Sequence, residues 1–169
     1  ALIASKRISP VEVVRAHLDR IDITEPILNS FISPPGDEAL EAARLAEREI
    51  GQGRYRGPLH GIPVGLKDLF YVKGKRNTSG SRIFDSFVPT YDGTVAARLK
   101  GAGAILMGKL NLHQFAFGPT GLNADYGHMH NPWDPSRLAG GSSGGSGSAT
   151  AAGQCTIAMG TDTGGSIRI

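Results

Sequence analysis

The chain has 169 residues, with 18 Lys and Arg against 15 Asp and Glu, and a net charge of +3. The charges are scattered and form no basic run, so direct binding of nucleic acid is not expected. Charged residues at 20% and hydrophobic residues at 40% are ordinary for a globular protein and exclude a disordered chain.

The single cysteine, Cys155, excludes an internal disulfide framework and a zinc site built from several cysteines. No apolar run reaches the length of a membrane span, and no signal-peptide pattern opens the chain. These features predict no membrane association and a cytoplasmic, reducing compartment.

The amino-terminal third predicts two helices. Ser9, Pro10 and Glu12 form a capping box, with Ser9 at the N-cap, Pro10 at the first helical position and Glu12 at N3. Apolar residues follow at helical spacing, and Pro26 is expected to end this helix. A second helix is expected from about residue 37 to 50, and its charged outer face indicates that it covers a sheet.

The rest of the chain alternates short helices with short buried strands, which predicts the α/β fold class. The expected strands are residues 62–72 (one or two short strands), 105–107 and 156–159; the expected helices are 94–100, 112–117 and 146–152. Residues 74–93 are expected to form loop with short extended pieces, and residues 118–145 are rich in Gly, Pro and Asn and too irregular for a long element.

Lys67 is flanked on both sides by apolar residues, although lysine is rarely buried without a reason. One interpretation is an edge-strand lysine that pairs with Asp68 or reaches water. The other is a desolvated lysine whose lowered pKa allows it to act as a base.

Glycine is the outlier of the composition: the chain has 24, and they are densest in the last third. The segment 140–146 places Ser142 and Ser143 between two glycine pairs, which permits close approach of a ligand but also fits a flexible linker. Gly140, Ser142 and Gly144 match a hydrolase nucleophile elbow; that elbow needs a preceding strand and a later His, and no His follows residue 130.

The segment 160–166 follows an expected buried strand and is either a simple turn or an anion-binding run of backbone N–H groups. If Ser166 attacks a carbonyl, those N–H groups could stabilise the oxyanion. Asp162 would then serve as a structural anchor for Arg168.

Two weaker patterns are set aside. Residues 103–109 resemble a phosphate-binding loop but lack the hydroxyl residue that should follow. Asp125, His128 and His130 fit surface polar residues better than a metal site.

Together, Lys67 and the segments 140–146 and 160–168 closely resemble the amidase signature family. The similarity extends to the amino-terminal helix, to residues 61–68, 101–104, 108–109 and 131–133, and to Asn111, and so spans nearly the whole chain. It implies an α/β fold with a mixed β-sheet core covered by helices, incomplete in this chain. We expect residues 1–169 to be the amino-terminal part of a single amidase domain, with the remainder following Ile169.

The resemblance also implies a role for each site residue. Ser166 corresponds to the nucleophile, Lys67 to the base, and Ser142, preceded by a cis peptide bond, to the serine that relays the proton between them. The backbone N–H groups of the oxyanion hole and the supporting residues are, in order, Thr163, Gly164, Gly165 and Ser166, then Ser143, Asp162 and Arg168. By analogy of position, Phe115, Ala116 and Phe117 border a substrate pocket, although two aromatics on a short helix are more often core.

The implied activity is hydrolysis of a small-molecule carboxylic amide to acid and ammonia or amine, through an acyl-enzyme on Ser166 and without metal or cofactor. An alternative is the glutamine-hydrolysing component of a tRNA-dependent amidotransferase, its A subunit, which would need a partner subunit; His113 and Gln114 stand where such subunits often carry an acidic pair. A further alternative is a non-catalytic scaffold protein, against which the intact Lys67, Ser142 and Ser166 argue. A homodimer is compatible with the leading interpretation.

Overall fold

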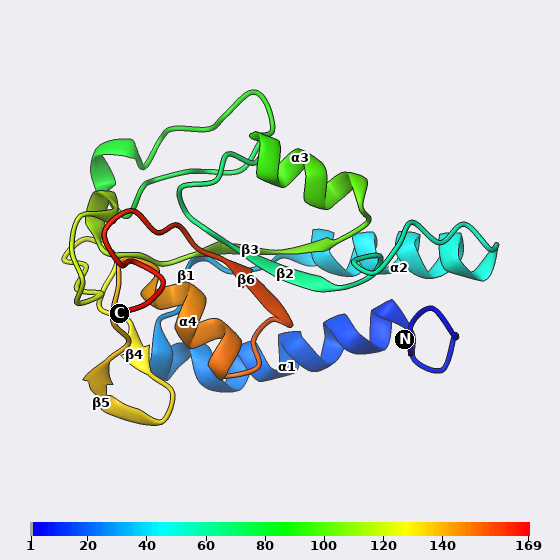
Figure 1. Ribbon diagram of the computed structural model, residues 1–169, viewed down its shortest axis with the longest axis horizontal. Coiled ribbons are helices and arrows are strands. Elements are labelled where there is room, and N and C mark those ends of the chain that lie inside the picture. Colours follow the sequence, from blue (N-terminus) through cyan, green and yellow to red (C-terminus); the bar gives the residue numbers. More distant parts are fainter. Residues whose placement is uncertain (1) are drawn as a thin grey trace.

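A four-stranded mixed sheet runs through the centre of the computed structural model, which describes residues 2–169 (Figure 1). Its strand order is β1-β3-β2-β6, with bounds Phe31–Ser33 for β1, Pro63–Lys67 for β2, Ile105–Leu110 for β3 and Ile157–Met159 for β6. Strand β2 is parallel to both β3 and β6, while β1 pairs antiparallel with β3 at the edge. The predicted mixed sheet is therefore confirmed, and β1 is an addition that the sequence analysis missed.

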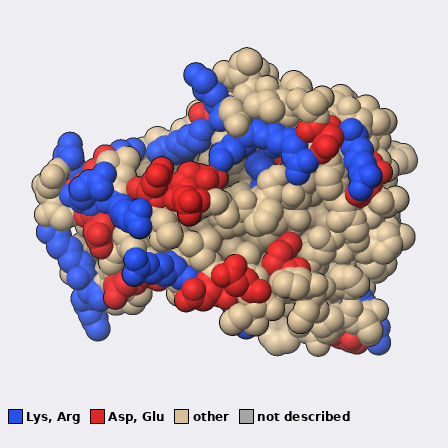
Figure 2. Space-filling view, turned by 180° about the vertical axis from the view of Figure 1, so that it is seen from behind, with Lys and Arg blue, Asp and Glu red and all other residues tan. Residues whose placement is uncertain are grey.

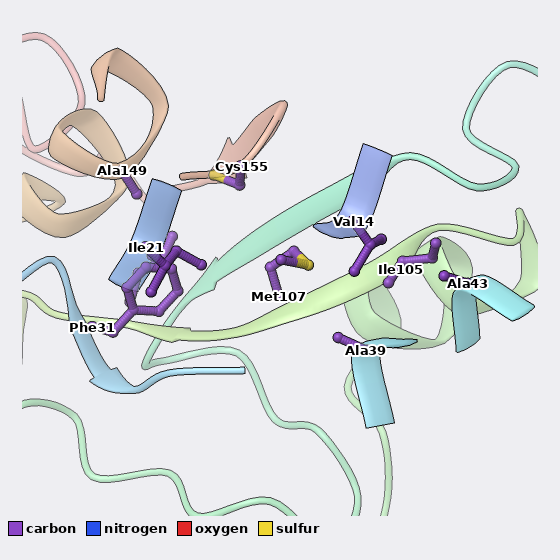
Figure 3. Packing of buried hydrophobic residues seen from close by; sticks show 10 residues of the cluster. Val14, Ile21, Phe31, Ala39, Ala43, Ile105, Met107, Ala149 and Cys155 are labelled. Atoms are coloured by element: carbon purple, nitrogen blue, oxygen red, sulfur yellow. The ribbon is translucent and has the colours of Figure 1, made fainter. Parts of the chain in front are cut away.

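The helices are α1 (Pro10–Leu28), α2 (Asp37–Gly51), α3 (Thr94–Gly101) and α4 (Gly144–Ala151). Helices α1, α2 and α4 meet β3 in one buried cluster, whose members include Val14, Ile21, Ala39, Ala43, Ile105, Met107 and Ala149 (Figure 3). A second cluster joins Val64 and Leu66 of β2 to Ala96 of α3. Helices thus cover both faces of the sheet, as Figure 1 also shows for α3 and α4.

The pleat of β2 decides where Lys67 points. Because side chains alternate along a strand, Val64 and Leu66 face the α3 cluster, whereas Gly65 and Lys67 face the other side. A Cβ at Gly65 would lie 2.7 Å from Leu110 Cδ1 and 3.3 Å from Cys155 Sγ, so the strand packs closely against that side. Lys67 therefore reaches toward the start of α4.

The capping box of α1 is confirmed, because the Ser9 hydroxyl accepts from the Val11 N–H and the Glu12 carboxylate accepts from the Ser9 N–H. The expected end at Pro26 is wrong: α1 continues to Leu28 and is capped by Asn29 in the left-handed conformation, at φ 50°. Near a carboxyl end, proline removes only one hydrogen bond of the helix, and Asn tolerates the left-handed cap well. Helices α2 and α3 match their predicted ranges to within a residue.

Three expected segments differ in the structure. The predicted helix 112–117 is only a 3-10 turn at Gln114–Ala116, because Phe115 and Ala116 have φ of 55° and 56°, outside the helical region. The irregular segment 118–145 contains a small antiparallel hairpin formed by β4 (His130–Asn131) and β5 (Asp134–Leu138). A short 3-10 turn at Arg82–Phe84 also interrupts the predicted loop 74–93.

Two glycines of α4 provide a matched test of this packing. A Cβ at Gly145 would lie 2.4 Å from Asn111 O and 2.5 Å from Ser30 O, both of them backbone atoms, whereas Gly147 has open space around it. We expect Gly145→Ala to lower the free energy of unfolding by about 1–3 kcal/mol or more, because the backbone must move. Gly147→Ala should instead raise it by about 0.5–1 kcal/mol. Urea unfolding of both variants in the full-length protein measures the difference, and equal effects would contradict the packing described.

Among residues 2–169, no helix combines the length and the apolar character that crossing a membrane requires. A cavity of about 580 Å³ lies between α2 and the loop that follows β2, and includes Leu66 and Lys109 in its wall. Acidic and basic side chains lie close together on the rear face of the molecule (Figure 2). Since Leu66 and Lys67 point to opposite sides of the sheet, this cavity is separate from the lysine predicted to act as a base.

Candidate active site

Three segments distant in sequence meet at one edge of the sheet. Lys67 is the last residue of β2, the segment 160–166 follows β6, and Ser142 and Ser143 immediately precede α4. The carboxyl ends of β2 and β6 lie side by side because the two strands are parallel and in direct register. This edge therefore holds the lysine, the serine pair and the glycine-rich turn together.

The Lys67 ammonium lies among three hydroxyl groups. Its Nζ donates to Ser142 Oγ at 2.7 Å, to Thr161 Oγ1 at 2.8 Å and to Ser143 Oγ at 2.9 Å. The side chain is fully buried, and this burial lowers the pKa of Lys67 from 10.5 to about 8, although the nearby Asp162 carboxylate acts in the opposite direction. A lysine with this pKa supplies a substantial fraction of neutral amine in mildly alkaline solution.

The alternative pairing of Lys67 with Asp68 is wrong. Asp68 is fully buried and accepts instead from Lys109 Nζ at 2.5 Å and from the backbone N–H and hydroxyl of Thr78 at 2.7 and 2.6 Å. Lys109 lies on β3 beside Leu66, so the ion pair is on the face of the sheet opposite the Lys67 side chain. The Asp68 charge is thus already balanced, and Lys67 is left to the hydroxyl groups.

Ser142 is fully buried, and the peptide bond between Gly141 and Ser142 is cis, as the family resemblance implied. Its carbonyl accepts the His113 N–H at 3.1 Å. The interpretation of 140–146 as a flexible linker is wrong, because the segment is largely buried and its second half forms the start of α4.

Ser166 lies beside the serine pair, and its carbonyl accepts the Ser143 N–H at 3.0 Å. The residue is partly buried. Within residues 2–169 its hydroxyl takes part in no hydrogen bond. The direct contact between the Ser142 and Ser166 hydroxyls that a proton relay requires therefore stays a prediction.

The turn 163–166 presents backbone N–H groups, as predicted. In the described part of the chain, the N–H groups of Thr163, Gly164 and Ser166 donate to no protein acceptor. The expectation for Gly165 needs correction, because its N–H donates to Asp162 Oδ1 at 2.8 Å. The Asp162 side chain caps the turn in the way that Asp commonly does, and this leaves three N–H groups of the predicted four for an anion.

Asp162 also anchors the end of the chain, as expected. Arg168 Nε donates to Asp162 Oδ2 at 2.8 Å, and Arg168 Nη2 donates to Oδ1 at 3.0 Å. This bidentate pair holds the pKa of Asp162 well below its ordinary value, with help from the N–H groups of Gly165 and Ile167. The turn is thus held at both ends by a single carboxylate.

The residues expected to border a substrate pocket lie at the surface. Phe115 is 46% exposed and packs edge-on against Phe84 at 6.2 Å between ring centroids, while Phe117 is 89% exposed. Neither ring belongs to the core, so the alternative of two core aromatics is wrong. The segment is linked to the serine pair through the His113 N–H, which donates to the Ser142 carbonyl and keeps the segment beside the site.

Thr161 is the site residue that the sequence analysis missed. It lies one residue before Asp162, and its hydroxyl accepts from Lys67 Nζ. The available signal was a hydroxyl residue two positions after the end of β6, the strand that pairs with the lysine-bearing β2. Only the parallel register of β2 and β6 shows that the two side chains meet.

Asp125, His128 and His130 hydrogen-bond separately: Asp125 Oδ2 with Gln114, His128 with Asn123, and His130 with Pro135.

Comparison with known proteins finds similarity to the amidase family and to amidotransferase subunits. A family model described as Amidase matches residues 12–169. The A subunit of the glutamyl-tRNA(Gln) amidotransferase of Acidothermus cellulolyticus is 46% identical over 168 residues, covering 99% of this chain and 33% of that protein.

Solved structures of amidases also superpose closely on this chain. A crystal structure of an amidase superposes with a TM-score of 0.93 at 40% identity, covering 99% of this chain and 38% of that one. A bacterial aryl acylamidase of the amidase signature family superposes with a TM-score of 0.92 at 37% identity, covering 99% and 35% respectively. The chain spans about a third of the length of the curated relatives it matches.

Proposed function

The chain belongs to the amidase family, and we propose that it carries the catalytic residues of an amidase that hydrolyses a carboxylic amide to the acid and ammonia or an amine. The observation that carries the proposal is the fully buried Lys67 amine enclosed by the hydroxyls of Ser142, Ser143 and Thr161. A purely structural lysine would be expected to face a carboxylate or water, whereas this one faces groups that can exchange protons.

In the proposed reaction, Ser166 Oγ attacks the amide carbonyl carbon as its proton passes to Ser142. Ser142 passes its own proton to the neutral amine of Lys67, which becomes an ammonium. The tetrahedral oxyanion accepts hydrogen bonds from the free N–H groups of Thr163, Gly164 and Ser166. Burial supports the basic role, because it lowers the pKa of Lys67 to about 8.

The tetrahedral adduct then collapses. The C–N bond breaks as the proton held on Lys67 returns through Ser142 to the leaving nitrogen, which departs as ammonia or an amine and leaves an ester on Ser166. Water attacks the ester carbonyl carbon and passes one proton through Ser142 to Lys67. As the ester C–O bond breaks, that proton returns through Ser142 to Ser166 Oγ, which frees the serine and releases the acid. Every group assigned a role belongs to the chain itself.

A second candidate function is that of the glutamine-hydrolysing component of a tRNA-dependent amidotransferase. The amidotransferase relatives, at 46–50% identity over nearly the whole chain, favour it. His113 and Gln114 at the position of an acidic pair count against it. Strict use of glutamine and co-purification with a partner subunit would support this function, whereas hydrolysis of simple amides by the isolated protein would favour the first.

Active-site labelling of the full-length native protein tests the proposal. A fluorophosphonate reacts with activated serines, and peptide mass spectrometry locates the adduct. We expect a single adduct on Ser166, formed faster above about pH 8, where Lys67 is largely neutral. A folded protein that remains unlabelled at Ser166 would contradict the proposed function and favour the non-catalytic scaffold.

A further inference from the structure

The three hydroxyls around Lys67 Nζ are not equivalent. The Ser143 hydroxyl donates to the Thr161 carbonyl at 3.0 Å, and its oxygen accepts from the Thr161 N–H at 3.2 Å as well as from Lys67. Its single proton is therefore committed to the backbone. Toward the amine, Ser143 can only accept a hydrogen bond.

Ser142 and Thr161 differ in their surroundings. Ser142 is fully buried, and within residues 2–169 its side chain hydrogen-bonds only to Lys67, so a neutral amine is the acceptor that the described chain offers for its proton. A buried hydroxyl proton without an acceptor costs about 1–3 kcal/mol. Thr161 is partly buried, and its hydroxyl proton can point to solvent while its oxygen accepts from Lys67.

We propose that Thr161 is a positioning residue that, together with Ser143, accepts the two N–H groups of neutral Lys67 and thereby directs the nitrogen lone pair at the Ser142 hydroxyl. A neutral amine has two N–H groups and one lone pair in a roughly tetrahedral arrangement. Once two directions are occupied by acceptors, the third faces the hydroxyl that can donate. The inference rests on the proposed amidase function and assigns Thr161 a part in it.

The charges near this amine are few. The Asp162 carboxylate raises the pKa of Lys67 and is itself paired with Arg168, and the Asp68–Lys109 pair lies across the sheet. Thr161 adds an acceptor that stabilises the ammonium form. Removing it should therefore lower the pKa of Lys67 further, because the charged amine loses more than the neutral one.

The test measures how fast a fluorophosphonate labels Ser166 across a pH series in the full-length protein. For Thr161→Val we expect the labelling rate at high pH to fall roughly 10- to 100-fold, because the lone pair is no longer held in place. The midpoint of the pH profile should move below the wild-type midpoint, which we expect near the Lys67 pKa of about 8. Thr161→Ser, which keeps the hydroxyl, should retain both the wild-type rate and the wild-type midpoint.

Thr156→Val is the matched control. Among the residues that the structure describes, the Thr156 hydroxyl hydrogen-bonds only to His17, away from the site, so the profile of this variant should stay unchanged. An unchanged Thr161→Val profile would overturn the proposal, and so would a midpoint that moves up toward 10.5, which indicates entry of water. If Thr161→Val does not fold, Thr161→Cys, a weak acceptor of similar size, carries the same expectation. Absence of labelling in the wild-type protein would count against the proposed function itself.

Discussion

Ser166→Ala in the full-length protein is expected to lower kcat for amide hydrolysis by about 10⁴-fold or more, with little change in KM. The substitution removes the hydroxyl oxygen that would form the acyl-enzyme. Substrate can still bind, but the covalent step cannot take place. Steady-state kinetics on a panel of simple amides and on glutamine measure the loss. The same panel reports which of the two candidate activities has been removed.

The fold should tolerate this substitution. The Ser166 hydroxyl makes no hydrogen bond within residues 2–169, and the contact with the Ser143 N–H uses the Ser166 carbonyl, which alanine retains. Ser136→Ala is a matched control, because Ser136 is exposed on β5 and, in the described part of the chain, its hydroxyl hydrogen-bonds only to Asp134. Ser166→Ala with wild-type kcat would contradict the nucleophile assignment, and equal losses in both variants would point to a general defect.

Local signals explain which parts of the fold could be predicted from the sequence. The start of α1 was predictable because Ser9 and Glu12 satisfy the first backbone N–H groups within four residues. The end of α1 was not, because the left-handed cap at Asn29 outweighs the single hydrogen bond lost at Pro26. Strand β1 has only three residues, too few to show a periodic pattern, and it exists through its pairing with β3.

The features of the site also divide into those that the sequence could predict and those that it could not. The need for a desolvated amine at Lys67 follows from the chemistry of the base, and the structure buries it fully. The contact with Thr161 depends on the register of two parallel strands, which no local pattern encodes. The hydrogen bond from the Gly165 N–H to Asp162, which removes this N–H from the predicted oxyanion hole, depends on the conformation of a single turn. Sequence reasoning therefore predicted that Lys67 and Ser142 lie together, but not the hydrogen bonds of Thr161 and of the Gly165 N–H.

Lys67→Met is expected to lower kcat by about 10³-fold or more, because the proton from Ser166 no longer has a base to reach. Lys67→Arg should be equally inactive, since a guanidinium keeps the charge but does not give up its proton near neutral pH. Lys73→Met is the matched control, as Lys73 is exposed on the loop after β2. Activity retained by Lys67→Arg would show that charge alone suffices and would contradict the proposed base.

The same substitution should change how stability depends on pH. The pKa of Lys67 is about 8 in the folded protein, against 10.5 for an ordinary lysine, so between these values the unfolded chain binds a proton that the native chain has released. The free energy of unfolding should therefore rise with pH across this window, by about 3 kcal/mol in all, while below it the buried ammonium is a constant cost. Lys67→Met lacks the titrating group, so its stability should rise less from pH 7 to pH 10.5 than that of the wild type, by that amount. Urea unfolding of both proteins at the two pH values measures the difference, in which the other titrating groups cancel. Equal slopes would mean that Lys67 keeps an ordinary pKa when folded, and the protein would then lack the neutral amine that the proposed hydroxyl relay requires.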